Sequence, residues 1–144
     1  MQCGQAAEKG METQFEWDQL VDALRDELQE KGGVIRLLNQ QTEVLYRRDS
    51  SAVAQVGEQI RGQLCLATRC TQARELILGQ IASKMKSGED IDRSAILGQF
   101  PEYVRPLLEA LFGEVDRLSG RMDERLKQNQ QLKDRLLTEA ESTV

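Results

Sequence analysis

The chain has 144 residues, of which 40% are apolar, 30% charged and 4% aromatic, and its formal net charge is −5. Scarce aromatic residues and only two prolines favour long helices around one modest core, with too few strand-forming residues for a sheet. The acidic balance disfavours nucleic acid as a partner, and no apolar run approaches the roughly 20 residues of a membrane span.

The first segment, residues 1–12, is polar and contains Gly4 and Gly10. We expect it to be a disordered leader that lies outside the fold. It has no apolar core of the kind that a secretory signal carries, so a cytoplasmic location is expected.

A heptad pattern predicts a first helix over about residues 13–47, with Gly32 and Gly33 in its middle. The positions on this pattern are Trp17, Val21, Leu24, Leu28, Lys31, Ile35, Leu38, Thr42 and Leu45. Each glycine costs about 1 kcal/mol relative to alanine inside a helix. Either the helix bends at this pair or another element packs very close to it.

A second helix is predicted over about residues 50–86. The segment 48–51, Arg-Asp-Ser-Ser, supplies short side-chain oxygens that can cap its first turn. Its apolar stripe runs from Val53 to Met85 and has a polar middle that includes Thr71 and Arg74. The helix is expected to end at 86–88, Lys-Ser-Gly.

The connector from residue 88 to 106 should contain one short helix, capped by Asp90 or Asp92 and ending before Gly98. Proline suits the first turn of a helix and disfavours its interior, so the third long helix is expected to start near Pro106 and to run to about 139. Its pattern positions are Leu108, Leu111, Val115, Leu118, Met122, Arg125, Asn129, Leu132 and Leu136. A polar tail is expected at 141–144.

The predicted fold class is all-α: an antiparallel bundle or coiled coil of three long helices with a short connector helix, forming a single domain over residues 13–140. The residues expected to be largely buried are Leu24, Leu28, Leu38, Ile60, Leu64, Ile81, Leu111, Val115 and Leu118. We also expect an aromatic cluster at one end of the bundle, made of Trp17, Phe100 and Tyr103 with Phe112 nearby.

No enzyme is predicted, and neither a cofactor nor a metal site. The chain has no histidine, and no phosphate-binding, dinucleotide-binding or nucleophile motif occurs. The spacing of Cys65 and Cys70 suits neither a disulfide framework nor zinc, so both are interpreted as reduced small residues of the core or its flank. Glycines inside the helical patterns, at 57, 62, 79, 113 and 120, are interpreted as close contacts between helices.

The order and the junctions of these helices resemble the FlgN family of flagellar export chaperones over about residues 14–139. The resemblance rests on 48–49, Arg-Asp, on Glu58 with Gln59, on Arg74, and on a last helix with leucines around Asn129. Further matching positions are Ala52, Val56, Leu64, Leu118, Met122, Leu132, Leu136 and Leu137. Gln59 replaces the usual lysine, and Leu126 stands where the family often has an asparagine.

This resemblance implies a cytoplasmic chaperone of type III flagellar export. Such a protein binds the C-terminal helical segments of hook-associated junction proteins and prevents their premature assembly. Components of the export apparatus are a further implied partner, although no motif in this chain locates that contact. No membrane insertion is expected, and a homo-oligomer is left open.

The client site is placed on residues 122–137 of the third long helix, at Met122, Leu126, Asn129, Leu132, Leu136 and Leu137. These residues spread over more of the helix circumference than one seam needs, and Arg125 and Asn129 interrupt the apolar stripe. The bundle should therefore be loosest here. Alternatively, the leucines complete the intramolecular coil or a homodimer, with Asn129 fixing the register.

Other functions also fit the pattern. A structural coiled-coil module that only oligomerises would have the same heptads, and a chaperone or regulator of another secretion system would be hard to tell apart from the favoured family. A helical enzyme based on carboxylates is the remaining alternative.

Overall fold

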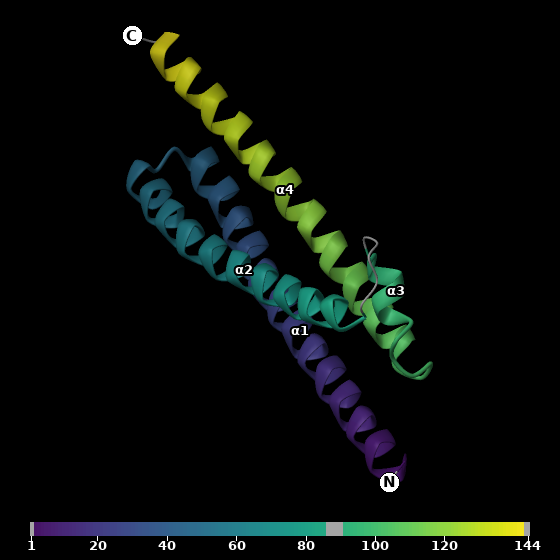
Figure 1. Ribbon diagram of the computed structural model, residues 1–144. Helices are drawn as coiled ribbons and strands as arrows, with labels where there is room; N and C mark the ends of the chain where they lie inside the picture. The colour runs from purple at the N-terminus through teal and green to yellow at the C-terminus, as the bar shows by residue number, and fades with distance from the viewer. Residues whose placement is uncertain (1, 86–90, 143–144) are drawn as a thin grey trace. The chain divides into compact units, whose positions relative to one another are not determined.

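A computed structural model of the protein describes residues 2–85 and 91–142. The helices are α1 (Gln2–Arg47), α2 (Ser50–Lys84), α3 (Arg93–Leu97) and α4 (Arg105–Ser142) (Figure 1). Within those two ranges there is no strand, and no helix combines the length and apolar composition that crossing a membrane requires. The long helices pack against one another, so the all-α prediction is confirmed.

The first helix begins earlier than expected. Residues 1–12 were expected to be a disordered leader, but α1 already starts at Gln2. The segment 6–9, Ala-Ala-Glu-Lys, consists of strong helix formers and no proline interrupts it, so Gly4 and Gly10 weaken the helix without ending it. The expected end of α2 at 86–88 lies outside the described residues, and so does Asp90, the alternative cap of the short connector helix.

The turn between α1 and α2 has the predicted capping chemistry. Arg48 adopts φ 58°, and its backbone N–H donates to the Leu45 carbonyl at 3.1 Å, which closes the last turn of α1. The Asp49 carboxylate then accepts from the backbone N–H of Ala52 at 3.1 Å, so Asp49 caps α2.

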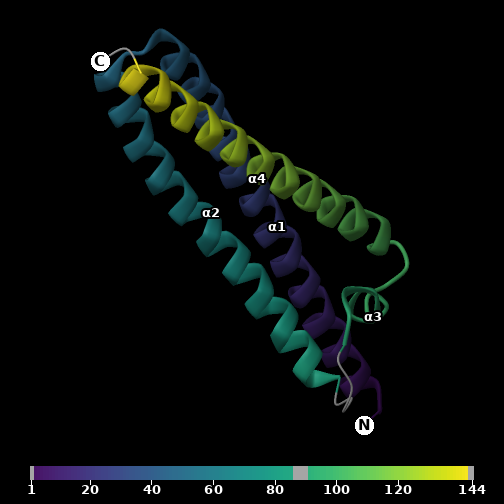
Figure 2. The same cartoon turned by 90° about the horizontal axis from the view of Figure 1, so that it is seen from above.

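The connector to α4 also follows its sequence signals. Asp92 caps α3 by accepting from the Ala95 N–H at 2.8 Å. The Arg105 guanidinium donates to the carbonyls of Phe100 and Gly98, which holds the chain between α3 and the start of α4. Figure 2 shows the course of the backbone from α3 to α4. Pro106 lies in the first turn of α4, where its missing N–H leaves no helical bond unmade.

The chain divides into two compact units that share the long helices. Unit 1 comprises Met1–Glu27 and Arg69–Val115, and unit 2 comprises Leu28–Thr68 and Asp116–Val144. The single domain expected over residues 13–140 thus consists of two units, each built from parts of α1, α2 and α4.

The core of unit 1 draws most of its buried side chains from the first half of α1, from α3 and the residues after it, and from the start of α4. Its largest fully buried side chains are Leu20, Leu24, Phe100, Leu108 and Phe112.

The expected aromatic cluster is therefore only partly present. Phe100 and Phe112 are buried and Trp17 is half-buried, but Tyr103 is 79% exposed, so its inclusion was wrong. Val104 fills the inward position beside it.

The core of unit 2 is a smaller aliphatic cluster of Val34, Leu38, Val56, Ile60 and Ala67. The partly buried residues Leu37, Val44, Leu64, Met122 and Leu126 pack against it. At the end of this unit the Arg48 guanidinium pairs with Glu139 at 3.1 Å, which ties the α1–α2 turn to the last part of α4.

The predicted core is right for Leu24, Leu38, Ile60, Ile81 and Val115, which are all buried. The other members of the expected set, Leu28, Leu64, Leu111 and Leu118, are only half-buried. At the start of α4 the buried stripe follows Leu108, Phe112 and Val115, so Phe112 takes the inward place that the pattern assigned to Leu111.

The helical glycines do not mark close helix contacts, with one exception. A Cβ added at Gly57, Gly62, Gly79, Gly113 or Gly120 would meet no atom within 4 Å, so the interpretation of these five was wrong. In the Gly32–Gly33 pair, only Gly33 is approached. A Cβ there would lie 2.7 Å from the Gln63 side-chain nitrogen, which donates to the Glu30 carbonyl at 3.0 Å.

This difference predicts opposite responses to alanine. Gly113→Ala and Gly120→Ala should each stabilise the protein by up to about 1 kcal/mol, because alanine lowers the entropy of the unfolded chain and fits the helix. Gly33→Ala should show no such gain, since Gln63 must leave its hydrogen bonds to Glu30. Urea unfolding curves of the three variants check this, and an equal gain at Gly33 would contradict it.

Candidate functional site

The six residues of the predicted client site do not form one exposed surface. Met122 and Leu126 pack against the core of unit 2, and Leu132 is 7% exposed. Leu136 is half-buried, and only Leu137, 63% exposed, is largely open.

Asn129 is a structural residue of unit 2. Its side-chain nitrogen donates to the Leu38 carbonyl and to the Gln41 side-chain oxygen, both at 2.9 Å. Its side-chain oxygen accepts from the Thr42 hydroxyl at 2.8 Å. With 3% of its surface exposed and these bonds made, Asn129 joins α4 to α1, so the expectation of a loose seam around it was wrong. The network fits the alternative in which Asn129 fixes the register.

An open apolar groove lies on the other side of this part of α4. We call it the α2–α4 groove; it has a volume of about 580 Å³ and lies entirely within unit 2. Its lining residues are Leu45, Arg48, Ser50, Val53, Ala54, Gln130, Lys133, Asp134, Leu136, Leu137 and Ala140. The groove therefore contains two of the six predicted residues, Leu136 and Leu137, and joins them to the start of α2.

The apolar wall of the α2–α4 groove comes from Leu45, Val53, Leu136 and Leu137. Charged groups stand among the lining residues: Arg48 is paired with Glu139, and Asp134 accepts from the Gln130 amide at 3.0 Å. Two of the three charged lining residues, Arg48 and Asp134, thus already bond within the protein. The surface that remains for a partner is mainly apolar. Such a surface can bury one face of an amphipathic helix.

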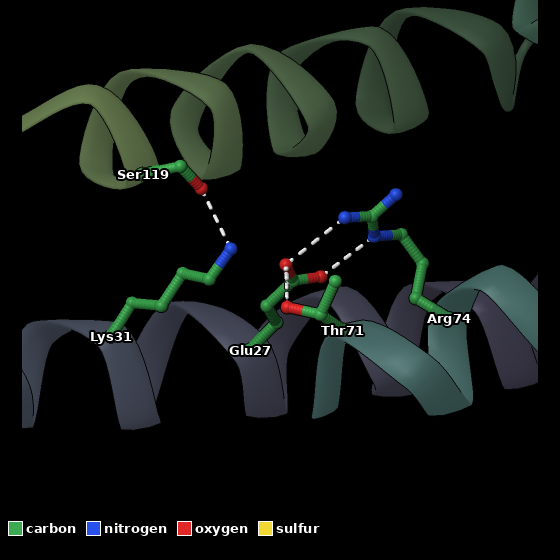
Figure 3. Close-up of polar contacts among 5 residues, drawn as sticks. All are labelled: Glu27, Lys31, Thr71, Arg74 and Ser119. Atoms are coloured by element: carbon green, nitrogen blue, oxygen red, sulfur yellow. Dashed lines mark hydrogen bonds and ion pairs between the residues drawn. The ribbon is translucent and has the colours of Figure 1, made fainter. Parts of the chain in front are cut away.

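Sequence reasoning missed a buried ion pair in unit 1. The Glu27 side chain is fully buried, and its carboxylate accepts from Arg74 Nε at 2.7 Å and from the Thr71 hydroxyl at 2.9 Å (Figure 3). Arg74 also lies 5.9 Å from the centre of the Phe112 ring. The sequence did indicate this pair, because Thr71 and Arg74 stand at positions of α2 where the stripe pattern predicts apolar side chains.

The polar residues on the heptad pattern of α1 also bond to a neighbouring helix. The Lys31 ammonium, which interrupts the first heptad stripe, donates to the Ser119 hydroxyl of α4 at 2.7 Å within unit 2 (Figure 3). Thr42, the other interruption, bonds to Asn129. The positions that break the apolar pattern are thus the positions where two helices bond to each other.

Within residues 2–85 and 91–142, no group of three or more acidic, cysteine or histidine side chains could hold a metal ion. Neither Cys65, which is exposed, nor Cys70, which is half-buried, takes part in a disulfide bond.

Comparison with known proteins adds no assignment. No protein-family model matches the chain, and neither does any curated protein or solved structure.

Proposed function

We propose that the protein is a chaperone of type III flagellar export, of the FlgN kind. It binds the C-terminal helical segments of hook-associated junction proteins in the cytoplasm and keeps them unassembled. The observation that carries this proposal is the apolar α2–α4 groove with the largely exposed Leu137 at its edge.

An antiparallel arrangement of the three long helices belongs to this proposal. Within unit 1, Lys84 bonds to Glu16 while Arg74 bonds to Glu27, so later residues of α2 meet earlier residues of α1. Within unit 2, Asn129 meets Gln41 and Glu139 meets Arg48, so α4 advances in the same direction as α1. These pairings support an up, down, up course of α1, α2 and α4.

Binding in the groove would explain how the protein protects its client without ATP. The assembly helix of a junction protein is amphipathic, and its exposed apolar face would drive self-association. A partner that binds this face stabilises the unassembled state by mass action. The α2–α4 groove offers Leu136, Leu137 and Val53 to that face.

Variants at the groove test the proposal. Leu137→Asp places a charge on the groove, and Ala54→Glu does so from α2; both residues are exposed, so the core is untouched. Each should weaken binding of a junction protein's C-terminal segment by about tenfold or more, because a buried unpaired charge must be desolvated. Isothermal titration measures the affinity. Leu126 is left unchanged, since it packs against the core of unit 2.

Leu76→Asp is the matched control, because Leu76 of α2 is also 63% exposed but belongs to unit 1 and does not line the groove. It should retain wild-type affinity. Undiminished binding in both groove variants would overturn the assignment of the site. Self-association of the wild-type protein with no affinity for the segment would favour the structural coiled-coil module.

A further inference from the structure

The side of α4 that faces α1 carries a second, chemically different hollow in unit 2. We call it the α1–α4 pocket; its volume is about 410 Å³. Its lining residues are Thr42, Tyr46, Arg125, Gln128, Asn129, Gln131, Leu132 and Arg135. A smaller hollow adjoins it through Arg125 and Gln128 and adds Arg121 and Glu124.

The α1–α4 pocket contains positive charge without an acidic partner. Neither Arg125, which is half-buried, nor Arg135 has an ion pair among the described residues, and no acidic side chain lines the pocket. Three other cations have an acidic partner: Arg74 pairs with Glu27, Lys84 with Glu16 and Arg48 with Glu139. Exposed cations such as Arg36 and Lys127 also form no ion pair among the described residues, but they line neither this pocket nor the groove. What distinguishes Arg125 and the exposed Arg135 is therefore that both line one hollow without an acidic side chain. Glu124, which lines the adjoining hollow, accepts from the Gln128 amide at 3.4 Å.

Two unmatched guanidinium groups in a hollow are suited to carboxylates. Arginine presents several donors in one plane and binds a carboxylate through two hydrogen bonds at once. The Gln128 and Gln131 amides lie between the two arginines and can donate as well, and the ring of Tyr46, 64% exposed, gives the wall an apolar part. On a protein of net charge −5, such a pocket attracts an acidic segment locally while the remaining surface repels it.

We propose that the α1–α4 pocket binds an acidic helical segment of a second partner protein, by pairing Arg125 and Arg135 with two of its carboxylates. The two arginines are nearly three turns apart on α4, about 15 Å along the axis. Acidic residues two to three turns apart on the bound helix match that span. The pocket shares no lining residue with the α2–α4 groove, so this inference does not depend on the proposed client.

The test uses the full-length chain and two synthetic alanine-rich helical peptides labelled with a fluorophore. One peptide carries glutamates two to three turns apart, and the other carries glutamines at the same positions. Fluorescence anisotropy should detect binding of the glutamate peptide alone, weakening as salt is added. The Arg125→Gln/Arg135→Gln variant should lose about tenfold or more in affinity, and Arg125→Lys/Arg135→Lys should recover part of it.

The control is Arg36→Gln/Lys127→Gln, which removes the same charge from exposed positions of unit 2 outside both hollows. Equal losses in the control and pocket variants would reduce the effect to net charge and overturn the proposal. So would tighter binding of a single-stranded oligonucleotide than of the peptide, or dimerisation of the free chain that the pocket variant abolishes. Circular dichroism confirms that each variant keeps its helix content.

Discussion

Phe112→Ala is expected to lower the free energy of unfolding by about 3–5 kcal/mol, among the largest effects of any single substitution in the chain. The ring is 1% exposed in the core of unit 1, so its removal leaves a cavity that neighbouring side chains cannot fill. It also ends two cation–π contacts, since the Arg93 and Arg74 guanidinium carbons lie 4.3 and 5.9 Å from the ring centre. Urea unfolding followed by circular dichroism measures the loss.

Leu111→Ala is the matched comparison at the neighbouring position. Leu111 is only half-buried, so its truncation should cost clearly less than that of Phe112. A cost at Leu111 that equals or exceeds the cost at Phe112 would show that α4 packs in the register of the simple heptad pattern.

Arg74→Leu is expected to destabilise the protein by a similar amount, about 3–5 kcal/mol, because it leaves the buried Glu27 carboxylate without its cation. The Thr71 hydroxyl still donates to that carboxylate, but a neutral donor does not replace the charge. The same unfolding measurement gives the size of the effect.

Removing both charges separates the ion pair from simple packing. In Glu27→Leu/Arg74→Leu no unpaired charge is buried, so most of the lost stability should return. If the double variant is as unstable as the sum of the two single variants, the charges act independently and the account of this pair is wrong.

Much of the fold could be predicted from local chemistry. Asp49 and Asp92 cap their helices because a short carboxylate at that point reaches the free N–H groups of the next turn, which depends on a few neighbouring residues alone. Pro106 marks the start of α4 for the same kind of reason. The start of α1 at Gln2 was not expected, because the helix formers between Gly4 and Gly10 outweigh the two glycines.

Which face of each helix is buried was harder to predict, because it depends on the neighbouring helix. Phe112 rather than Leu111 points inward, and Glu27, which lies off the expected stripe, is buried because Arg74 and Thr71 meet it from α2. The five open glycines show the same limit, since nothing in a helix's own sequence reveals whether another helix approaches it.

The sequence predicted only part of the lining of the α2–α4 groove, because contacts between helices decide which side chains remain open. Leu136 and Leu137 line an open groove, whereas the Asn129 side chain is hydrogen-bonded to Gln41 and Thr42. No pattern along α4 alone could reveal these bonds. The unmatched arginines of the α1–α4 pocket were likewise hidden, because in the sequence Arg125 and Arg135 alternate with acidic residues. Only the contacts along α4 reveal that neither arginine forms an ion pair with another described residue.

Site-specific photo-cross-linking tests directly whether a junction protein binds in the α2–α4 groove. A photoreactive amino acid at position 137, with one at position 76 as the matched exposed site, is incorporated into the full chain and mixed with a junction protein. We expect a cross-link from position 137 to the C-terminal helical segment of that protein and none from position 76. A cross-link from position 76 with none from position 137 would contradict the assignment of the α2–α4 groove as the client site.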